Sequence, residues 1–126
     1  MFDLLVIYSS LVGMIVLFQL FVIFGAPVGH FDYGGFNDGK LPNGTRVLAG
    51  FYVVVLILSE LVVLIKLGYL NLYIYFDIEV LIASFVFMYA LIMVLHMLVK
   101  NSWDRHIWAP INMILMTASI MFYFTK

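Results

Sequence analysis

The sequence has no cysteine and few charged residues. Without cysteine, the chain cannot form disulfides, thiol nucleophiles or thiolate metal sites. Charged residues make up 10% of the chain and the formal net charge is −1, so the sequence lacks the basic stretches that bind nucleic acid. It also lacks a nucleophile–base motif, a phosphate-binding loop and a pair of catalytic carboxylates. An enzyme is therefore the least supported class, and the sequence indicates no cofactor.

Apolar side chains are present in large excess. Hydrophobic residues make up 66% of the chain and the mean hydropathy is +1.16, whereas soluble domains average about 45–50% apolar residues. The composition predicts an integral membrane protein with one domain over residues 1–126. Apolar stretches at about 4–24, 47–65, 78–99 and 108–125 are each long enough to cross a bilayer as a helix. The predicted fold class is an all-α, four-helix membrane bundle.

Glycine and proline are concentrated in one segment. Residues 25–46 hold six of the nine glycines and two of the three prolines. Both residue types are poor helix formers, so we predict an ordered loop between the first two spans. Within it, Asn43-Gly44 is a turn signal.

Two residues mark the starts of the later spans. Asp77 is predicted to cap the third span. Pro110 is predicted either to lie in the first turn of the fourth span or to kink it.

The lysines and arginines suggest an orientation. With four spans, the loop at 25–46 and the loop at about 100–108 lie on the same side of the membrane. That side carries four cationic residues (Lys40, Arg46, Lys100 and Arg105), and the opposite side carries Lys66 and Lys126. The positive-inside rule therefore predicts that both loops are cytoplasmic and both termini outside.

The two polar loops carry recognisable patterns. The first reads Gly-Ala-Pro-x-Gly at 25–29, Tyr-Gly-Gly at 33–35, Gly-x-Leu-Pro at 39–42, and then Arg46. The second contains Ser102, Trp103, Arg105, Trp108 and Pro110. Together they resemble a family of small, uncharacterised bacterial membrane proteins with four predicted spans, although Asp104 stands where that pattern has glutamate. The resemblance implies the topology and a bacterial cytoplasmic membrane, and it implies no activity.

Three polar residues inside the spans are predicted to lie at one depth. Gln19 is six residues before Gly25, His96 is near the end of the third span, and Asn112 is near the start of the fourth. All three are expected under the Gly-rich loop, where they form a candidate ligand-binding layer. Tyr8 shares a helix face with Gln19, and Tyr89 with His96. The alternative is that these side chains only bind neighbouring helices, at about 1 kcal/mol each.

Glu60 is a separate candidate. It lies six residues before Lys66, so we expect its carboxyl about 9 Å deep in the opposite leaflet. A lone embedded carboxylate is typical of small proton-coupled exporters, in which a proton and a cationic substrate compete for one acid. The alternative is that Glu60 reaches the interface, or pairs with Lys66 or a tyrosine.

The loops supply further candidate ligand-binding residues, His30 and Arg105. All three histidines, His30, His96 and His106, fall on the predicted cytoplasmic side, near Asp32 and Asp104. Histidine and carboxylate suit zinc, copper or iron. However, no pair has a helical i,i+4 spacing, so we assign no metal site.

Three functions follow as hypotheses. The first is a small membrane protein that binds or moves a hydrophobic or amphipathic small molecule through Gln19, His96, Asn112 and the loop. The second is a non-catalytic accessory subunit whose loops, or whose small residues Ala83 and Ala90, contact a membrane-protein partner. The third is a proton-coupled exporter that acts as a homodimer and depends on Glu60. In each case the expected surroundings are the lipid bilayer, and nucleic acid is not an expected partner.

Overall fold

The computed structural model describes residues 2–27, 42–98 and 103–125, which form an α-helical bundle. Its elements are α1 (Phe2–Ile23), α2 (Asn43–Lys66), α3 (Ile78–Leu98), the π-helical turn η3 (Asp104–Trp108) and α4 (Ala109–Tyr123). With η3 and α4 taken together as one span, all four helices are long and apolar enough to cross a membrane. The prediction of an all-α, four-helix membrane bundle is confirmed.

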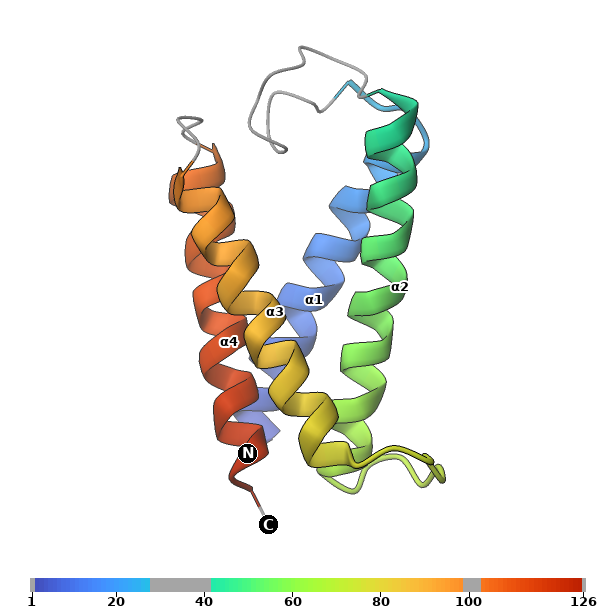
Figure 1. Ribbon diagram of the computed structural model, residues 1–126, viewed down its shortest axis with the longest axis vertical. Helices are drawn as coiled ribbons and strands as arrows, with labels where there is room; N and C mark the ends of the chain where they lie inside the picture. Colours follow the sequence, from blue (N-terminus) through green and yellow to red (C-terminus); the bar gives the residue numbers. More distant parts are fainter. Residues whose placement is uncertain (1, 28–41, 99–102, 126) are drawn as a thin grey trace.

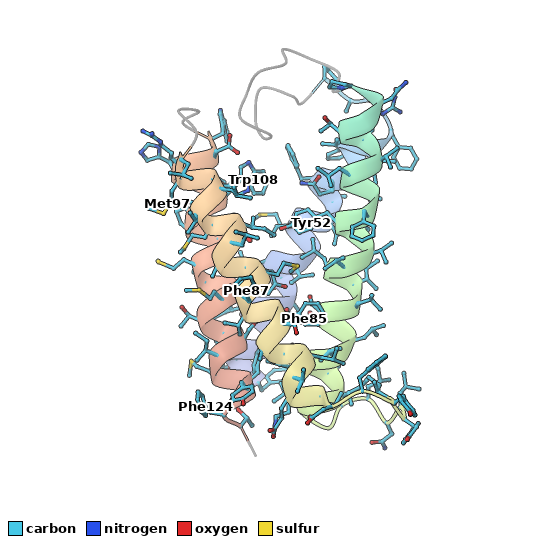
Figure 2. All side chains as sticks on the ribbon, in the orientation of Figure 1. Tyr52, Phe85, Phe87, Met97, Trp108 and Phe124 are labelled. Carbon is cyan, nitrogen blue, oxygen red and sulfur yellow. The ribbon has the colours of Figure 1, made fainter. Side chains whose placement is uncertain are left out.

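The bundle consists of two helix pairs. α1 packs mainly on α2, and α3 packs mainly on α4. Figure 1 shows that the pairs lie closer together at the end that carries both chain termini, which we call the terminal end. The opposite end, where α1 stops and η3 begins, we call the loop end. Outward-pointing side chains such as Met97 and Phe124 face the space that lipid would occupy (Figure 2).

Two glycines end the first two helices. Gly25 and Gly68 have φ values of 84° and 87°, a left-handed conformation that costs glycine little. After α1, the Ala26 N–H donates to the Phe21 carbonyl at 2.9 Å; after α2, the Tyr69 N–H donates to the Leu64 carbonyl at 3.0 Å. These are the bonds of a Schellman motif. Both helices therefore end on a glycine, and Pro27 follows the point where α1 has already stopped.

The connection between α2 and α3 is held by charged residues at the terminal end. The Glu79 N–H donates to the Asp77 carboxylate at 3.0 Å, which confirms Asp77 as the N-cap of α3. Lys66, at the end of α2, donates to Glu79 at 3.2 Å. Each charge also suits its helix end, because a cation favours a C-terminus and a carboxylate an N-terminus.

The interpretation of Asn43-Gly44 as a turn is wrong. α2 begins at Asn43, and Pro42 lies just before it in an extended conformation with φ −61° and ψ 158°. Proline is well suited to this boundary, because its fixed φ occurs both in extended backbone and in an α-helix. Asn43 and Gly44 therefore form the first turn of α2, four residues before the start that hydropathy predicts.

Arg46 joins the start of α2 to the end of α1. Its Nε and one terminal nitrogen donate to the Ile23 carbonyl at 2.9 and 2.6 Å. The last carbonyls of a helix have no partner within the helix, and a cation there also complements the helix dipole. The arginine thus ties the two helices together at the loop end.

We expect Arg46→Ala to destabilise the protein by about 1.5–3 kcal/mol, because charge-assisted hydrogen bonds to the Ile23 carbonyl are lost. Arg46→Lys should recover only part of this loss, since an ammonium group lacks the two-pronged geometry. Thermal unfolding in mild detergent measures both. Asn43→Ala is the control, because the Asn43 contact with Arg46 is long at 3.4 Å and exposed. Equal stability of Arg46→Ala and the control would contradict the assignment.

The fourth span begins with a π-helical turn. The Ala109 N–H donates to the Asp104 carbonyl, five residues back, where an α-helix would use the fourth. Pro110 follows in the first turn of α4. Proline has no N–H to donate, so in the interior of a helix it would leave one backbone carbonyl without its hydrogen bond. The widened turn just before Pro110 lets the chain enter α4 without this loss. Of the two predicted positions for Pro110, the structure therefore shows the first turn.

Candidate functional site

Three buried hydroxyl groups meet between the helix pairs, toward the terminal end. The Tyr8 hydroxyl on α1 lies 3.1 Å from the Ser59 oxygen on α2 and 2.8 Å from the Tyr89 oxygen on α3. Ser59 and Tyr89 are 3.0 Å apart. All three side chains are fully buried at 0% exposure. We call Tyr8, Ser59 and Tyr89 the hydroxyl cluster; it joins three of the four helices.

The protons of the cluster can be assigned from its partners. Ser59 donates to the Leu56 carbonyl in its own helix at 2.7 Å, and Tyr8 donates to Ser59. The Tyr89 hydroxyl proton is then shared between the Tyr8 and Ser59 oxygens. Ser119 on α4 lies near the Tyr8 hydroxyl, but its buried oxygen has no hydrogen-bond partner in the described part of the chain. The cluster is thus a nearly complete polar network inside an apolar core.

We expect Tyr8→Phe and Tyr89→Phe each to destabilise the protein by about 1 kcal/mol, the range for hydrogen bonds between membrane helices. The double variant should lose less than the sum, because both changes remove the same 2.8 Å bond. Unfolding by denaturing detergent measures all three. Tyr73→Phe, at a side chain 90% exposed, is the neutral control. Strict additivity would show that the two hydroxyls act separately.

Glu60 lies one residue beyond the cluster on α2. The Ser9 hydroxyl of α1 donates to its Oε1 atom in a short hydrogen bond. The other carboxyl oxygen, Oε2, is inaccessible to water and has no hydrogen-bond partner within the described residues. The proposed alternative partner, Lys66, is instead paired with Glu79. Two adjacent residues of α1, Tyr8 and Ser9, therefore contact two adjacent residues of α2, Ser59 and Glu60.

A second polar level lies toward the loop end. Phe18 on α1 packs on Trp108 with ring centroids 4.8 Å apart. Gln19 follows Phe18 in the sequence, and Asn112 lies one helical turn after Trp108. Both are buried at 1% exposure. Asn112 donates from Nδ2 to the Trp108 carbonyl at 2.9 Å, while its Oδ1 atom is buried and unpartnered within the described residues. We call Phe18, Gln19, Trp108 and Asn112 the loop-end layer.

The inner side of this layer is largely aromatic. Trp108 is buried, and Tyr52 on α2 is half-buried against the same core (Figure 2). Gln19 lies eleven residues after Tyr8, which places the loop-end layer about 16 Å from the hydroxyl cluster along α1. The bundle thus holds two polar levels separated by apolar packing.

His96 and Asp104 form a pair beside the loop-end layer. The His96 Nδ1 atom lies 2.7 Å from the Asp104 carboxylate, which accepts a hydrogen bond from the ring N–H. Asp104 is fully buried although it is an acid. The pair joins the end of α3 to η3. Glutamate, which the resembled pattern has here, would place its carboxylate one methylene farther from the backbone.

The sequence-predicted residues are thus distributed over both polar levels. Gln19 and Asn112 lie in the loop-end layer, His96 is paired with Asp104 beside it, and Glu60 is bound by Ser9 toward the other end. Arg105 is exposed on η3. His30 and most of the Gly-rich loop lie outside the described residues. Among the described residues there is no group of three side chains suited to hold a metal ion.

Sequence reasoning missed both serines of these sites, Ser59 and Ser9. A single serine in an apolar helix carries no clear signal, because it can bond to its own helix, as Ser84 does with the Val80 carbonyl. The useful signal is the pair of adjacent polar residues on each helix: Tyr8-Ser9 on α1 and Ser59-Glu60 on α2.

An open groove runs along the outer side of α3 at the terminal end. Its volume is about 520 Å³, and it is lined by Asp77, Glu79, Val80, Ala83, Ser84, Phe87 and Tyr123. Of the α3 residues, only Ile82 and Tyr89 are buried. This helix therefore presents most of its surface outside the bundle.

Comparisons with known proteins add no relative: no protein-family model, no curated protein and no solved structure matches the chain. The resemblance of the two loops to a bacterial family therefore stays a prediction.

Proposed function

We propose that this membrane protein binds a small amphipathic molecule at the loop-end layer. The observation that carries the proposal is the Asn112 Oδ1 atom, a buried acceptor without a partner among the described residues. Leaving such an atom unpaired costs about 1–3 kcal/mol, and more where no water can reach it. A ligand that donates a hydrogen bond to Asn112 would recover this energy.

The chemistry of the layer specifies the ligand class. Asn112 supplies an acceptor, the buried Gln19 amide lies one residue from Phe18, and Phe18 and Trp108 form an apolar aromatic wall. Small-molecule sites in proteins typically combine a few polar groups that orient a ligand with apolar walls that hold its body. The expected ligand therefore has a hydroxyl, amine or amide N–H at one end and a hydrophobic remainder.

Native mass spectrometry of the protein released from mild detergent tests this proposal. The wild-type protein should retain an extra mass, and Asn112→Leu should lose it, because leucine removes the acceptor at similar volume. The unfolding free energy of the ligand-free variant should stay within about 1 kcal/mol of wild type, since one N–H···O bond is lost together with one unpaired oxygen.

The matched control is Thr117→Val on the same helix. The Thr117 hydroxyl is exposed and bonds only to the Met113 carbonyl of α4, so its loss should leave the bound mass unchanged. A wild-type protein without any retained mass, or equal retention in Asn112→Leu, would overturn the assignment of the layer as a binding site.

A second function is favoured by α3. An accessory subunit needs a helix face for its partner, and α3 leaves Ala83 exposed in the lining of the groove described above. Small residues let two membrane helices approach closely. Ala90, seven residues later, is half-buried, so the small-residue face narrows toward the loop end.

If α3 contacts another chain, Ala83→Leu should shift the protein toward a single chain by filling the groove. Val80→Leu is the control, because Val80 lines the same groove but already has a branched side chain. The distribution of masses in native mass spectrometry measures both variants. An unchanged distribution in Ala83→Leu would exclude this face as the contact.

A further inference from the structure

Glu60 is an acid placed within the membrane. It lies on α2 six residues before Lys66, which puts its carboxyl about 9 Å inside the end of a helix long enough to span. One carboxyl oxygen accepts from Ser9, and the other is buried without a partner within the described residues. A charged carboxylate in such a position is costly unless a cation balances it.

Among the described residues, the cation near this end of the bundle is already engaged. Lys66, the nearest in sequence, is paired with Glu79 at 3.2 Å. The guanidinium of Arg46 lies on the Ile23 carbonyl, at the opposite end of α2. The other titratable groups on α1 to α4 are Asp3, Tyr8, Tyr52, Glu79, Tyr89, His96 and Tyr123. Of these only His96 can carry a positive charge, and it is paired with Asp104 at the loop end.

A metal ion is also not supported as the balancing charge. Among the described residues, no three histidine, aspartate or glutamate side chains lie together. Among the described residues, Ser9 is the one hydrogen-bond partner of the carboxyl, and a hydroxyl can donate either to a carboxylate or to the carbonyl oxygen of a neutral acid. With one donor, a buried second oxygen and no balancing cation among the described residues, a carboxylate would be poorly compensated, which favours the neutral carboxylic acid.

We propose that Glu60 is a proton-binding site inside the membrane. A proton from water at the terminal end forms an O–H bond with Oε2, and Ser9 holds Oε1 in place. Binding removes one negative charge from the span. A neutral carboxylic acid whose O–H has no acceptor costs far less free energy than a buried, uncompensated carboxylate. This site is independent of the loop-end layer, and the hypothesis of a proton-coupled exporter depends on it.

The first test uses dicyclohexylcarbodiimide, an apolar reagent that partitions into the membrane region. It reacts with a protonated carboxyl: the acid proton moves to a carbodiimide nitrogen, and the carboxyl oxygen adds to the central carbon, with no leaving group. The full chain in mild detergent should gain one adduct, located at Glu60 by peptide mass spectrometry. The adduct should be lost in Glu60→Gln and kept in Ser9→Ala.

Glu79 is the matched control. Its side chain is 57% exposed and paired with Lys66, so the apolar reagent should spare it and a water-soluble carbodiimide should modify it. Modification of Glu79 but not Glu60 by the apolar reagent would overturn the proposal. So would an adduct count that is unchanged in Glu60→Gln.

A second measurement needs no variant. Glu60 and Glu79 are the only glutamates in the chain. Infrared spectroscopy of protein labelled with ¹³C-glutamate therefore separates these two groups from the aspartates. A labelled C=O band of a neutral carboxylic acid at neutral pH, which shifts in deuterated buffer if the proton exchanges, supports the proposal. Carboxylate bands alone would contradict it even if Glu60→Gln failed to fold.

Discussion

The structure depends on where the chain can place hydrogen-bonding groups in an apolar environment. The hydroxyl cluster of Tyr8, Ser59 and Tyr89 is the clearest case, because it joins α1, α2 and α3 at one buried point. Within each helix pair, apolar packing is extensive; between the pairs, contacts are fewer. Lipid is as apolar as these helices, so packing alone gives little preference for one arrangement of the pairs. Directional hydrogen bonds supply that preference.

The two ends of the bundle differ in how they satisfy their polar groups. At the terminal end, charges pair locally: Asp77 caps α3, and Lys66 binds Glu79. At the loop end, each helix pair is joined internally: Arg46 on α2 binds the Ile23 carbonyl of α1, and His96 on α3 binds Asp104 at the start of the fourth span. Between these two contacts lies the buried aromatic and amide layer at which we propose that a ligand binds.

Much of the fold could be predicted because it depends on local rules. The spans follow from apolar length, and the cap at Asp77 follows from the preference of its side chain for helix starts. The start of α2 could not be read in the same way, because Asn43-Gly44 fits a turn as well as the first turn of a helix. Sequence also placed Gln19 and Asn112 inside the bundle at a shared level, since depth can be counted along a helix. It could not show that Asn112 leaves an oxygen unpaired, or that Ser9 binds Glu60, because these depend on which helix faces meet.

The π-helical turn at Asp104–Trp108 has a consequence for how the chain can vary in length. A π turn holds one residue more than the matching α turn, so losing one exposed residue, such as Ile107, converts it to a regular turn. The faces on either side of the turn keep their directions. A deletion within α4 would instead rotate every later side chain by about 100° and turn Leu115 and Phe122 out of the core. Changes in the length of the fourth span are therefore tolerated in η3 and not in α4.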